Sequence, residues 1–304
     1  MTEVAEKKKS SRFVKYLPIH LFILPTIIIL CIFNYAPMMG IILAFQDYKP
    51  RLGMFHSPWV GLEHFHYLFT YPDGLQVIWN TLLIATLKIV ANTIVPIIFA
   101  LLINEVRQQA FKRTIQTMVY LPHFLSWVVL GGILTDLLSN SGMINQLLVR
   151  LGFDSIHFLG DGTWFRIILV VSDVWKEFGF SAIIYLAALS GISPVLYEAG
   201  EIDGAWWRQT LNITLPALIP VIVVVVTLSL GNILNAGFDQ IFNLYNPLVY
   251  HEGDIIDTFV YRVGLMSGSF SFATAVGLFK SAVSFVLVVI AYRLAYRFGN
   301  YRIF

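Results

Sequence analysis

Six long apolar stretches alternate with short polar segments along the chain. A helix that crosses a membrane needs about 20 predominantly apolar residues. The pattern therefore predicts an all-α membrane protein with six transmembrane helices in one membrane domain at residues 17–297. The expected spans are 17–45, 77–103, 115–138, 165–190, 215–238 and 272–295, between a basic tail at 1–16 and a short tail at 298–304.

Lysine and arginine are unevenly distributed among the polar segments. If the N-terminus lies inside the cell, the inner segments carry twelve of these residues and the outer segments carry four. Cytoplasmic loops of membrane proteins have an excess of Lys and Arg. We therefore expect both termini and the loop at 191–214 to be cytoplasmic.

Composition narrows the class of protein further. Of the 304 residues, 57% are hydrophobic and only 12% are charged, whereas a soluble domain carries about 25% charged residues. The net charge of +2 and the lack of a basic run with aromatics beyond the N-terminal tail argue against nucleic-acid binding. His64 and His66 are the only closely spaced histidines, and they do not indicate a metal site.

A polar island at 191–214 separates the fourth and fifth predicted spans. Ser193-Pro194 is a favourable helix start, and Asp203-Gly204 is a helix breaker. A second short helix is expected over 205–211, before Leu215-Pro216 opens the next span. The island is thus predicted to form a helix–turn–helix elbow at the cytoplasmic surface. Physical reasoning alone leaves two interpretations: an interfacial helix anchored by Trp side chains, or a docking site for another protein.

The island has a distinctive residue order, Glu198-Ala199-Gly200, then Asp203-Gly204-Ala205, then Ile213 and Leu215-Pro216. This order resembles the cytoplasmic loop of permease subunits of binding-protein-dependent ABC importers, although Gly200 stands where that family usually has Ala. Tyr120-Leu121-Pro122 and Trp175-Lys176-Glu177 extend the likeness to the carbohydrate-uptake branch, akin to maltose-type and LplB-like permeases. The resemblance implies the type I ABC importer permease fold. It also implies an ATPase-coupling role for Glu198, Ala199, Gly200, Asp203, Gly204, Ala205, Leu215 and Pro216.

The energy source is expected on another chain. A P-loop requires Gly-x-x-x-x-Gly-Lys-Ser/Thr, and the nearest candidate, at 277–281, lies in a predicted span and has Phe before its Lys. We therefore expect no enzyme activity and no bound cofactor, with ATP and Mg held by the partner. The resemblance implies a second homologous permease subunit in a heterodimer, a cytoplasmic ATPase dimer, an extracytoplasmic solute-binding protein and a carbohydrate substrate. It also implies the lipid bilayer of a bacterial cytoplasmic (cell) membrane.

The fourth predicted span carries charges, which cost about 2.5–3.5 kcal/mol each at the centre of a membrane helix. Asp173 and Lys176 are spaced to pair on one helix face, with Glu177 beside them. Trp175 and Phe180 supply aromatic faces that suit sugar rings. Two interpretations stay open: an internal ion-pair network that locks helix packing, or a pore-facing substrate site, which the resemblance to maltose-type permeases favours.

A second polar group lies towards the end of the fifth predicted span. Asn232 and Asn235 share a helix face, and Asp239 and Gln240 follow them. Amides both donate and accept hydrogen bonds, which suits ligands rich in hydroxyls. Hydrogen bonding between helices is an equally good interpretation, and the resemblance favours a substrate pathway that includes Asn232, Asn235 and Asp239. Lys88 and Lys280 are interpreted as ion-pairing or helix-packing residues.

The leading hypothesis is one half of a heterodimeric pore that translocates an oligosaccharide or related carbohydrate, driven by ATP hydrolysis on a partner. An ion-coupled secondary transporter is the alternative, because Asp173 and Glu177 lie within a span. That alternative leaves the polar island unexplained. A membrane enzyme is disfavoured, since the spans carry no Gly-x-Ser-x-Gly or His-Glu-x-x-His motif.

Overall fold

The computed structural model describes residues 16–203 and 206–299, in which the regular elements are helices joined by turns and irregular segments, with an isolated β-bridge between Gln46 and Trp59. Residues 1–15 and 300–304, which make up most of the predicted tails at 1–16 and 298–304, lie outside the described residues, as do Gly204 and Ala205. The elements before the elbow are α2 (Leu17–Leu30), the π-helical turn η1 (Cys31–Tyr35), the 3-10 helix η2 (Ala36–Phe45), α3 (Gly53–His56), α4 (Glu63–Thr70), α5 (Gly74–Asn104), α6 (Gln109–Tyr120), the 3-10 turn η3 (Leu121–Phe124), α7 (Trp127–Leu138), α8 (Met143–Arg150) and α9 (Gly162–Ser190).

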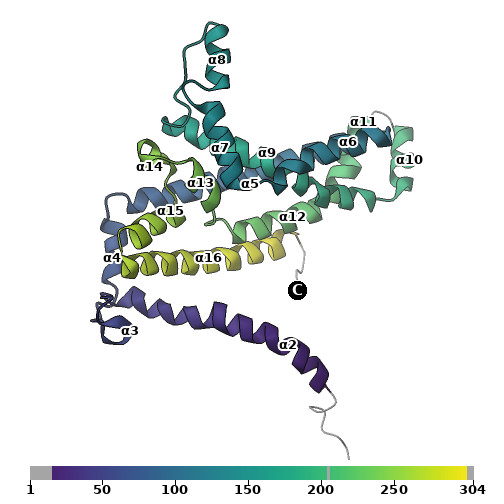
Figure 1. Ribbon diagram of the computed structural model, residues 1–304. Coiled ribbons are helices and arrows are strands. Elements are labelled where there is room, and N and C mark those ends of the chain that lie inside the picture. The colour runs from purple at the N-terminus through teal and green to yellow at the C-terminus, as the bar shows by residue number, and fades with distance from the viewer. Residues whose placement is uncertain (1–15, 204–205, 300–304) are drawn as a thin grey trace, which may run out of the picture.

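The second half of the chain holds the elbow and the last two long helices. Its elements are α10 (Pro194–Asp203), α11 (Trp206–Gln209), the π-helical turn η4 (Thr210–Thr214), α12 (Leu215–Gly231), α13 (Phe238–Leu244), the 3-10 turn η5 (Pro247–Val249), α14 (Tyr250–Gly253), α15 (Ile256–Val260), the π-helical turn η6 (Tyr261–Met266) and α16 (Phe270–Gly299). Figure 1 shows α10 and α11 at one end of the long helices and α13 to α15 towards the opposite end.

Five helical stretches in the described ranges are long and apolar enough to cross a membrane. They are Ile19–Phe45, Gly74–Asn104, Trp127–Arg150, Thr210–Gly231 and Phe270–Arg293. The fourth predicted span, 165–190, forms the 29-residue helix α9 but is not among the five. Three charged residues, Asp173, Lys176 and Glu177, interrupt its apolar run.

Two predicted spans are broken where continuous helix was expected. The span expected at 115–138 stops at Tyr120 and resumes at Trp127, because Pro122 follows and cannot donate a helical hydrogen bond. The span expected at 215–238 stops at Gly231, and Gly237 then adopts a left-handed φ of 98° just before α13. Glycine has no Cβ and takes this conformation without steric cost. Both expected spans are therefore interrupted by segments that are not α-helical.

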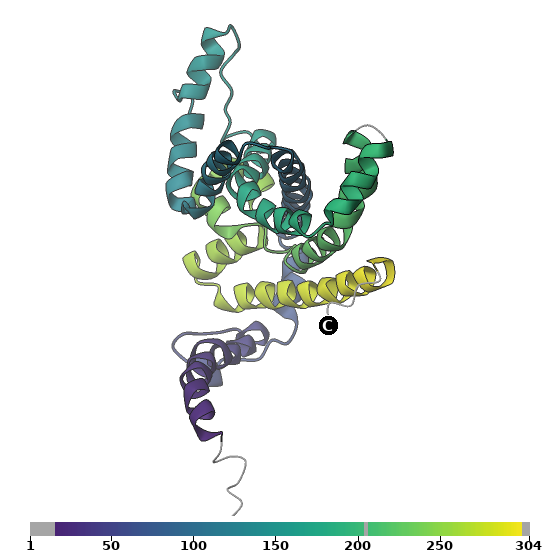
Figure 2. The ribbon, with the colours of Figure 1, turned by 90° about the vertical axis from the view of Figure 1, so that its right-hand side faces the viewer.

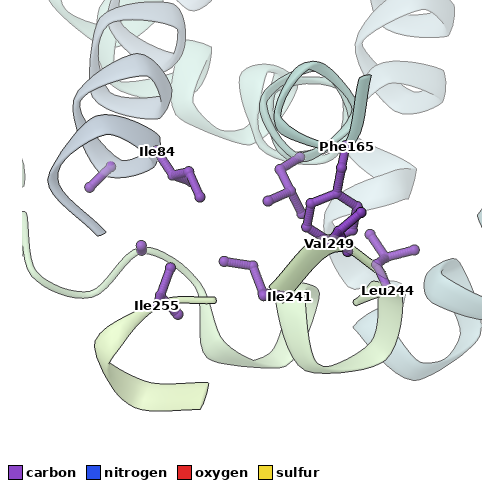
Figure 3. Close-up of a cluster of buried hydrophobic side chains, with 9 residues drawn as sticks. Ile84, Phe165, Ile241, Leu244, Val249 and Ile255 are labelled. Atoms are coloured by element: carbon purple, nitrogen blue, oxygen red, sulfur yellow. The ribbon is translucent and has the colours of Figure 1, made fainter. Parts of the chain in front are cut away.

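The hydrophobic core lies where α5 and α9 meet α13. Ile84 of α5, Phe165 of α9, and Ile241 and Leu244 of α13 belong to one buried cluster (Figure 3). Full burial of such a side chain contributes roughly 1.5–3 kcal/mol. α6 also approaches α9 closely at Gly179. A Cβ on this residue would lie 2.3 Å from the carbonyl oxygen of Val119, so only glycine fits there. This packing fixes the position of the charged turn of α9.

The first helix stands apart from the rest of the molecule. α2 lies away from α16 in both Figure 1 and Figure 2. Every side chain of α2 whose exposure the structure describes is exposed, although the helix is almost entirely apolar. This chain alone therefore leaves a long apolar helix uncovered.

Candidate functional site: a charged cavity and a cytoplasmic elbow

The predicted elbow forms between α9 and α12. α10 begins at Pro194, as the Ser193-Pro194 pair predicts, and the backbone N–H of Leu196 donates to the Ser193 carbonyl at 3.1 Å. The chain then turns back through α11 and η4, and α12 begins at Leu215 with Pro216 in its first turn. The elbow is thus continuous with the long helix α9 at one end and with α12 at the other (Figure 1).

Contacts within the elbow hold α10 against the turn that precedes α12. The Tyr197 hydroxyl lies 3.1 Å from Oγ1 of Thr214, which is buried. A Cβ on Gly200 would lie 3.0 Å from Cδ1 of Ile213 and 3.1 Å from Cγ of Gln209. The absence of a side chain at Gly200 therefore serves packing inside the elbow.

The predicted coupling residues occupy different parts of this elbow. Glu198 is exposed on α10, Leu215 is half-buried and Pro216 is exposed at the start of α12. Ala199 and Asp203 lie in α10, whereas Gly204 and Ala205 fall outside the described residues. The carboxylate of Glu198 thus lies on the surface of the elbow.

Asp173 pairs with a different helix from the one expected. Its Oδ1 lies 3.3 Å from Nζ of Lys88 on α5, and its Oδ2 accepts a hydrogen bond of 2.8 Å from Asn92. The predicted pair between Asp173 and Lys176 does not form. Lys176 instead donates to Oε1 of its neighbour Glu177, at 2.8 Å.

Lys88 connects this ion pair to the segment that follows α12. Its Nζ donates to the carbonyl oxygen of Ala236 at 2.8 Å and to Oε1 of Gln240. The amide nitrogen of Gln240 donates in turn to the Leu169 carbonyl and to Oγ of Ser172, each at 2.8 Å. A buried charge is tolerated when it is paired and hydrogen-bonded. The sequence indicated pairing for Lys88, and the structure confirms it.

A cavity of about 420 Å³ lies against this network. Its polar wall includes Lys88, Asn92, Asp173, Asn232 and Asn235, and its apolar wall includes Ile89, Ile184, Val225 and Leu228. The structure thus brings together three predicted substrate residues, Asp173 from α9 and Asn232 and Asn235 from the segment after α12. Asn92 is a lining residue that the sequence did not single out.

The remaining predicted substrate residues lie elsewhere. Trp175 borders a separate apolar cavity of about 280 Å³ with Leu134, Phe158 and Val171, because it projects from another face of α9. Asp239 is exposed in the first turn of α13. Neither belongs to the charged cavity.

Lys176, Glu177 and Phe180 form a second cluster at the break between α6 and α7. Oε2 of Glu177 lies 2.7 Å from Nδ1 of His123, and Lys176 donates to the His123 carbonyl at 2.8 Å. The His123 and Phe180 rings are parallel, with centroids 4.0 Å apart. The sequence did not single out His123, whose only signal was the adjacent Pro122. Asp173 and Glu177 therefore each contact a break between helices: Asp173 reaches the break after α12 through Lys88, and Glu177 reaches the break between α6 and α7 through His123.

Asn235 also contacts the last helix. Its Oδ1 accepts a hydrogen bond of 2.6 Å from Nζ of Lys280, which pairs with Asp257 at 2.6 Å. The pairing interpretation of Lys280 is therefore confirmed. The segment 232–237 is thus held by lysines from both α5 and α16.

Comparison with known proteins identifies the family. The family model described as "Binding-protein-dependent transport system inner membrane component" matches residues 92–300. The chain belongs to this family. It is 46% identical over 288 residues to the polygalacturonan/rhamnogalacturonan transport system permease protein YteP of Bacillus subtilis (strain 168), covering 94% of this chain and 89% of the relative. Protein LplB of the same organism is 41% identical over 288 residues, covering 94% and 91%.

Solved structures agree with this assignment. A bacterial ABC transporter involved in the import of the acidic polysaccharide alginate contains a chain that matches with a TM-score of 0.87 and 39% identity, over 94% of this chain and 97% of that chain. The same transporter type in complex with an alginate pentasaccharide-bound periplasmic protein matches with a TM-score of 0.86 and 39% identity, over 94% and 96%. The chain thus has the type I importer permease fold.

The family settles several predictions. The chain is a multi-pass permease of the inner membrane and the non-catalytic part of a binding-protein-dependent ABC importer, and permeases of this family bind no cofactor themselves. The alternative of an ion-coupled secondary transporter is therefore set aside. Asp173 and Glu177, the two residues that motivated it, are paired with Lys88 and Lys176.

Proposed function

We propose that this chain forms one half of the pore of an ABC importer for uronate-containing oligosaccharides, and that the cavity beside Lys88 and Asp173 is part of the pathway. The cavity itself is the observation that carries the proposal. It gathers charged and amide side chains where helix α12 ends and the non-helical segment 232–237 begins. Irregular backbone at membrane depth is tolerated where it is buried in protein or lines a water-filled cavity.

The chemistry of the cavity wall suits a carbohydrate. Asn232 and Asn235 are exposed amides, and Oδ1 of Asn92 is buried without a hydrogen-bond partner among the described residues. Such amides serve sugar hydroxyls as both donors and acceptors. Towards the cytoplasmic end, Glu177 and Phe180 extend the same face of α9 as Asp173, with Phe180 about 10 Å further along the helix axis. We infer that this face continues the pathway, and we assign Trp175, Lys176 and Asp239 no direct contact with substrate.

The uronate assignment follows from the named relatives. One is named for polygalacturonan/rhamnogalacturonan and another for the acidic polysaccharide alginate. Within this chain, Lys88 and Asp173 compensate each other across the cavity wall. We infer that the wall lets acidic sugars pass without holding them tightly, and that capture depends on an extracytoplasmic binding protein.

The chain is proposed to cross the membrane six times, with both termini in the cytoplasm. α9 supplies the sixth crossing, because its 29 residues are long enough and its charged side chains are paired. The exposed apolar helix α2 fits a second, homologous permease subunit, which would cover it in the assembled pore. The Lys and Arg distribution supports the orientation.

ATP hydrolysis on a cytoplasmic ATPase dimer is proposed to act through the elbow. Glu198, Ala199, Gly200, Asp203, Gly204, Ala205, Leu215 and Pro216 form the proposed coupling segment. The hydrogen bond between Tyr197 and Thr214 ties α10 to the start of α12. Because α12 leads directly to Asn232 and Asn235, a displacement of α10 would reach the cavity through one rigid helix.

Uptake of sugar into sealed vesicles tests this proposal. The complete transporter is reconstituted with its binding protein, and entry of labelled oligogalacturonate is measured with ATP on the ATPase side or with an imposed proton gradient. We expect uptake that requires ATP and persists after the gradient is collapsed. Uptake of neutral oligosaccharides alone would overturn the uronate assignment, and uptake that ignores ATP would overturn the proposal as a whole.

A further inference from the structure

The short helix α13 has two contrasting faces. Gln240, Ile241 and Leu244 are buried against the core. Phe238, Phe242 and the capping residue Tyr245 recur at helical spacing on another face and stay partly or fully exposed. The second face of α13 thus carries aromatic rings that stay partly accessible, with Tyr245 at its end also packed against the core.

These rings are continuous with one another. Phe238 and Phe242 stack with centroids 5.2 Å apart, and Tyr261 lies 4.9 Å from Phe242. Tyr245 follows at 6.0 Å from Phe242, and Tyr250 at 5.1 Å from Tyr245. The five rings form a row, which we call the aromatic track.

Both ends of the aromatic track are fixed. Phe238 directly follows Gly237, which lines the charged cavity, and Lys88 holds the neighbouring Ala236 carbonyl. At the other end, the Arg262 guanidinium lies 4.8 Å from the centre of the Tyr250 ring and pairs with the buried carboxylate of Asp254. The track therefore leads from a rigid polar anchor to the cavity.

We propose that the aromatic track is a carbohydrate-binding surface that guides an oligosaccharide from the extracytoplasmic side into the cavity. The C–H faces of sugar rings are apolar and stack on flat aromatic faces, while their hydroxyls stay hydrated at the rim. Tyr hydroxyls supply hydrogen-bond donors along the track, and the Arg262 guanidinium, whose charge is paired with Asp254, holds the Tyr250 ring in place. This inference rests on the proposed function and adds a second binding surface outside the cavity.

Lipid or the second permease subunit could cover the aromatic track instead of a sugar, and each predicts a different effect of side-chain shape on uptake. Aromatic residues also gather at the membrane interface, where their rings contact lipid head groups, and the second permease subunit could cover the same face. In either case an apolar side chain of similar size would serve. Stacking on sugar rings requires a flat ring, so replacing Phe242, which is 37% exposed, by Leu separates these explanations.

The test uses the complete transporter in proteoliposomes with tetragalacturonate as the probe. Phe242→Leu is expected to raise the KM of uptake about three- to tenfold, the range that corresponds to the loss of one aromatic contact. Phe242→Trp is expected to keep the wild-type KM. Phe285→Leu is the matched control, because Phe285 is an exposed ring on α16 outside the track, and its KM should not change.

Tryptophan fluorescence distinguishes a loss of sugar binding from a defect in assembly. The fluorescence of the Phe242→Trp transporter should shift on addition of tetragalacturonate, and the same residue at position 285 should not respond. An unchanged KM for Phe242→Leu would overturn the proposal that the aromatic track binds sugar. It would also be overturned if the Phe242→Trp transporter carried tetragalacturonate without any change in its fluorescence. Failure of the wild-type transporter to carry any oligosaccharide would instead refute the proposed function.

Discussion

Lys88 and Asp173 face each other across 3.3 Å at the wall of the cavity, on helices α5 and α9. Lys88 is 7% exposed and also donates to the backbone of the broken fifth crossing. Removing one partner of a buried ion pair leaves the other charge without compensation. This pair therefore links the stability of the bundle to the shape of the pathway.

Asp173→Asn is expected to destabilise the assembled transporter by about 3–5 kcal/mol, because it leaves Lys88 charged and buried. The measurement is the thermal unfolding of the purified complex. The double variant Lys88→Gln with Asp173→Asn removes both charges and should recover part of the loss. An unchanged unfolding temperature for Asp173→Asn would show that the pair does not stabilise the bundle.

Glu198→Lys is expected to separate ATP hydrolysis from transport while the subunit still inserts. The reason is that a carboxylate exposed on α10 is replaced by the opposite charge at the proposed contact with the ATPase. Uptake per ATP hydrolysed is the measured quantity. Glu105→Lys, at the exposed end of α5, provides the matched control on the same side of the membrane and should keep normal coupling. Normal coupling in Glu198→Lys would remove the coupling role.

Gly200 offers a graded test of the elbow. Gly200→Ala should be tolerated, because the added Cβ meets only the flexible ends of Ile213 and Gln209 at 3.0–3.1 Å. Gly200→Leu should separate α10 from the turn before α12 and lower uptake per ATP several-fold, since overpacking costs about 1–3 kcal/mol. If both variants couple as well as the wild type, the packing inside the elbow does not transmit force.

Asn235→Ala and Glu177→Ala are expected to reduce oligosaccharide uptake more than they reduce assembly. Asn235 lines the cavity and accepts a hydrogen bond from Lys280, while Glu177 accepts from Lys176 at the other break. The amount of complex in the membrane and the uptake rate per complex are measured together. Low assembly with normal uptake per complex would assign both residues a structural role only.

Much of the fold follows from local pattern. Apolar length located the membrane helices, and the Ser193-Pro194 start and the Leu215-Pro216 boundary located the elbow. Such signals lie within a few residues of the elements they define. The breaks in the third and fifth crossings had only weak local signals, Pro122 and Gly237, because proline and glycine also occur in continuous membrane helices.

The site was harder to predict because its contacts are distant in sequence. Asp173 and Lys176 are close enough in the chain to pair, yet Asp173 pairs with Lys88 from another helix. Helix rotation decides between such partners, and rotation depends on packing such as that of Gly179 against Val119. The three residues that meet at the cavity, Asp173, Asn232 and Asn235, were predicted by chemistry, whereas Asn92 and His123 needed the structure.

State-dependent labelling of the cavity tests the central claim most directly. A single cysteine replaces Asn232 in a transporter whose Cys31 is changed to Ser, and a membrane-impermeant maleimide is applied while the transporter turns over. Val171→Cys is the control, because Val171 borders the separate apolar cavity. We predict that the cysteine at 232 reacts, that bound oligogalacturonate slows the reaction, and that the control does not respond to the sugar. Labelling at 232 that ignores the sugar, or labelling only at 171, would contradict the account.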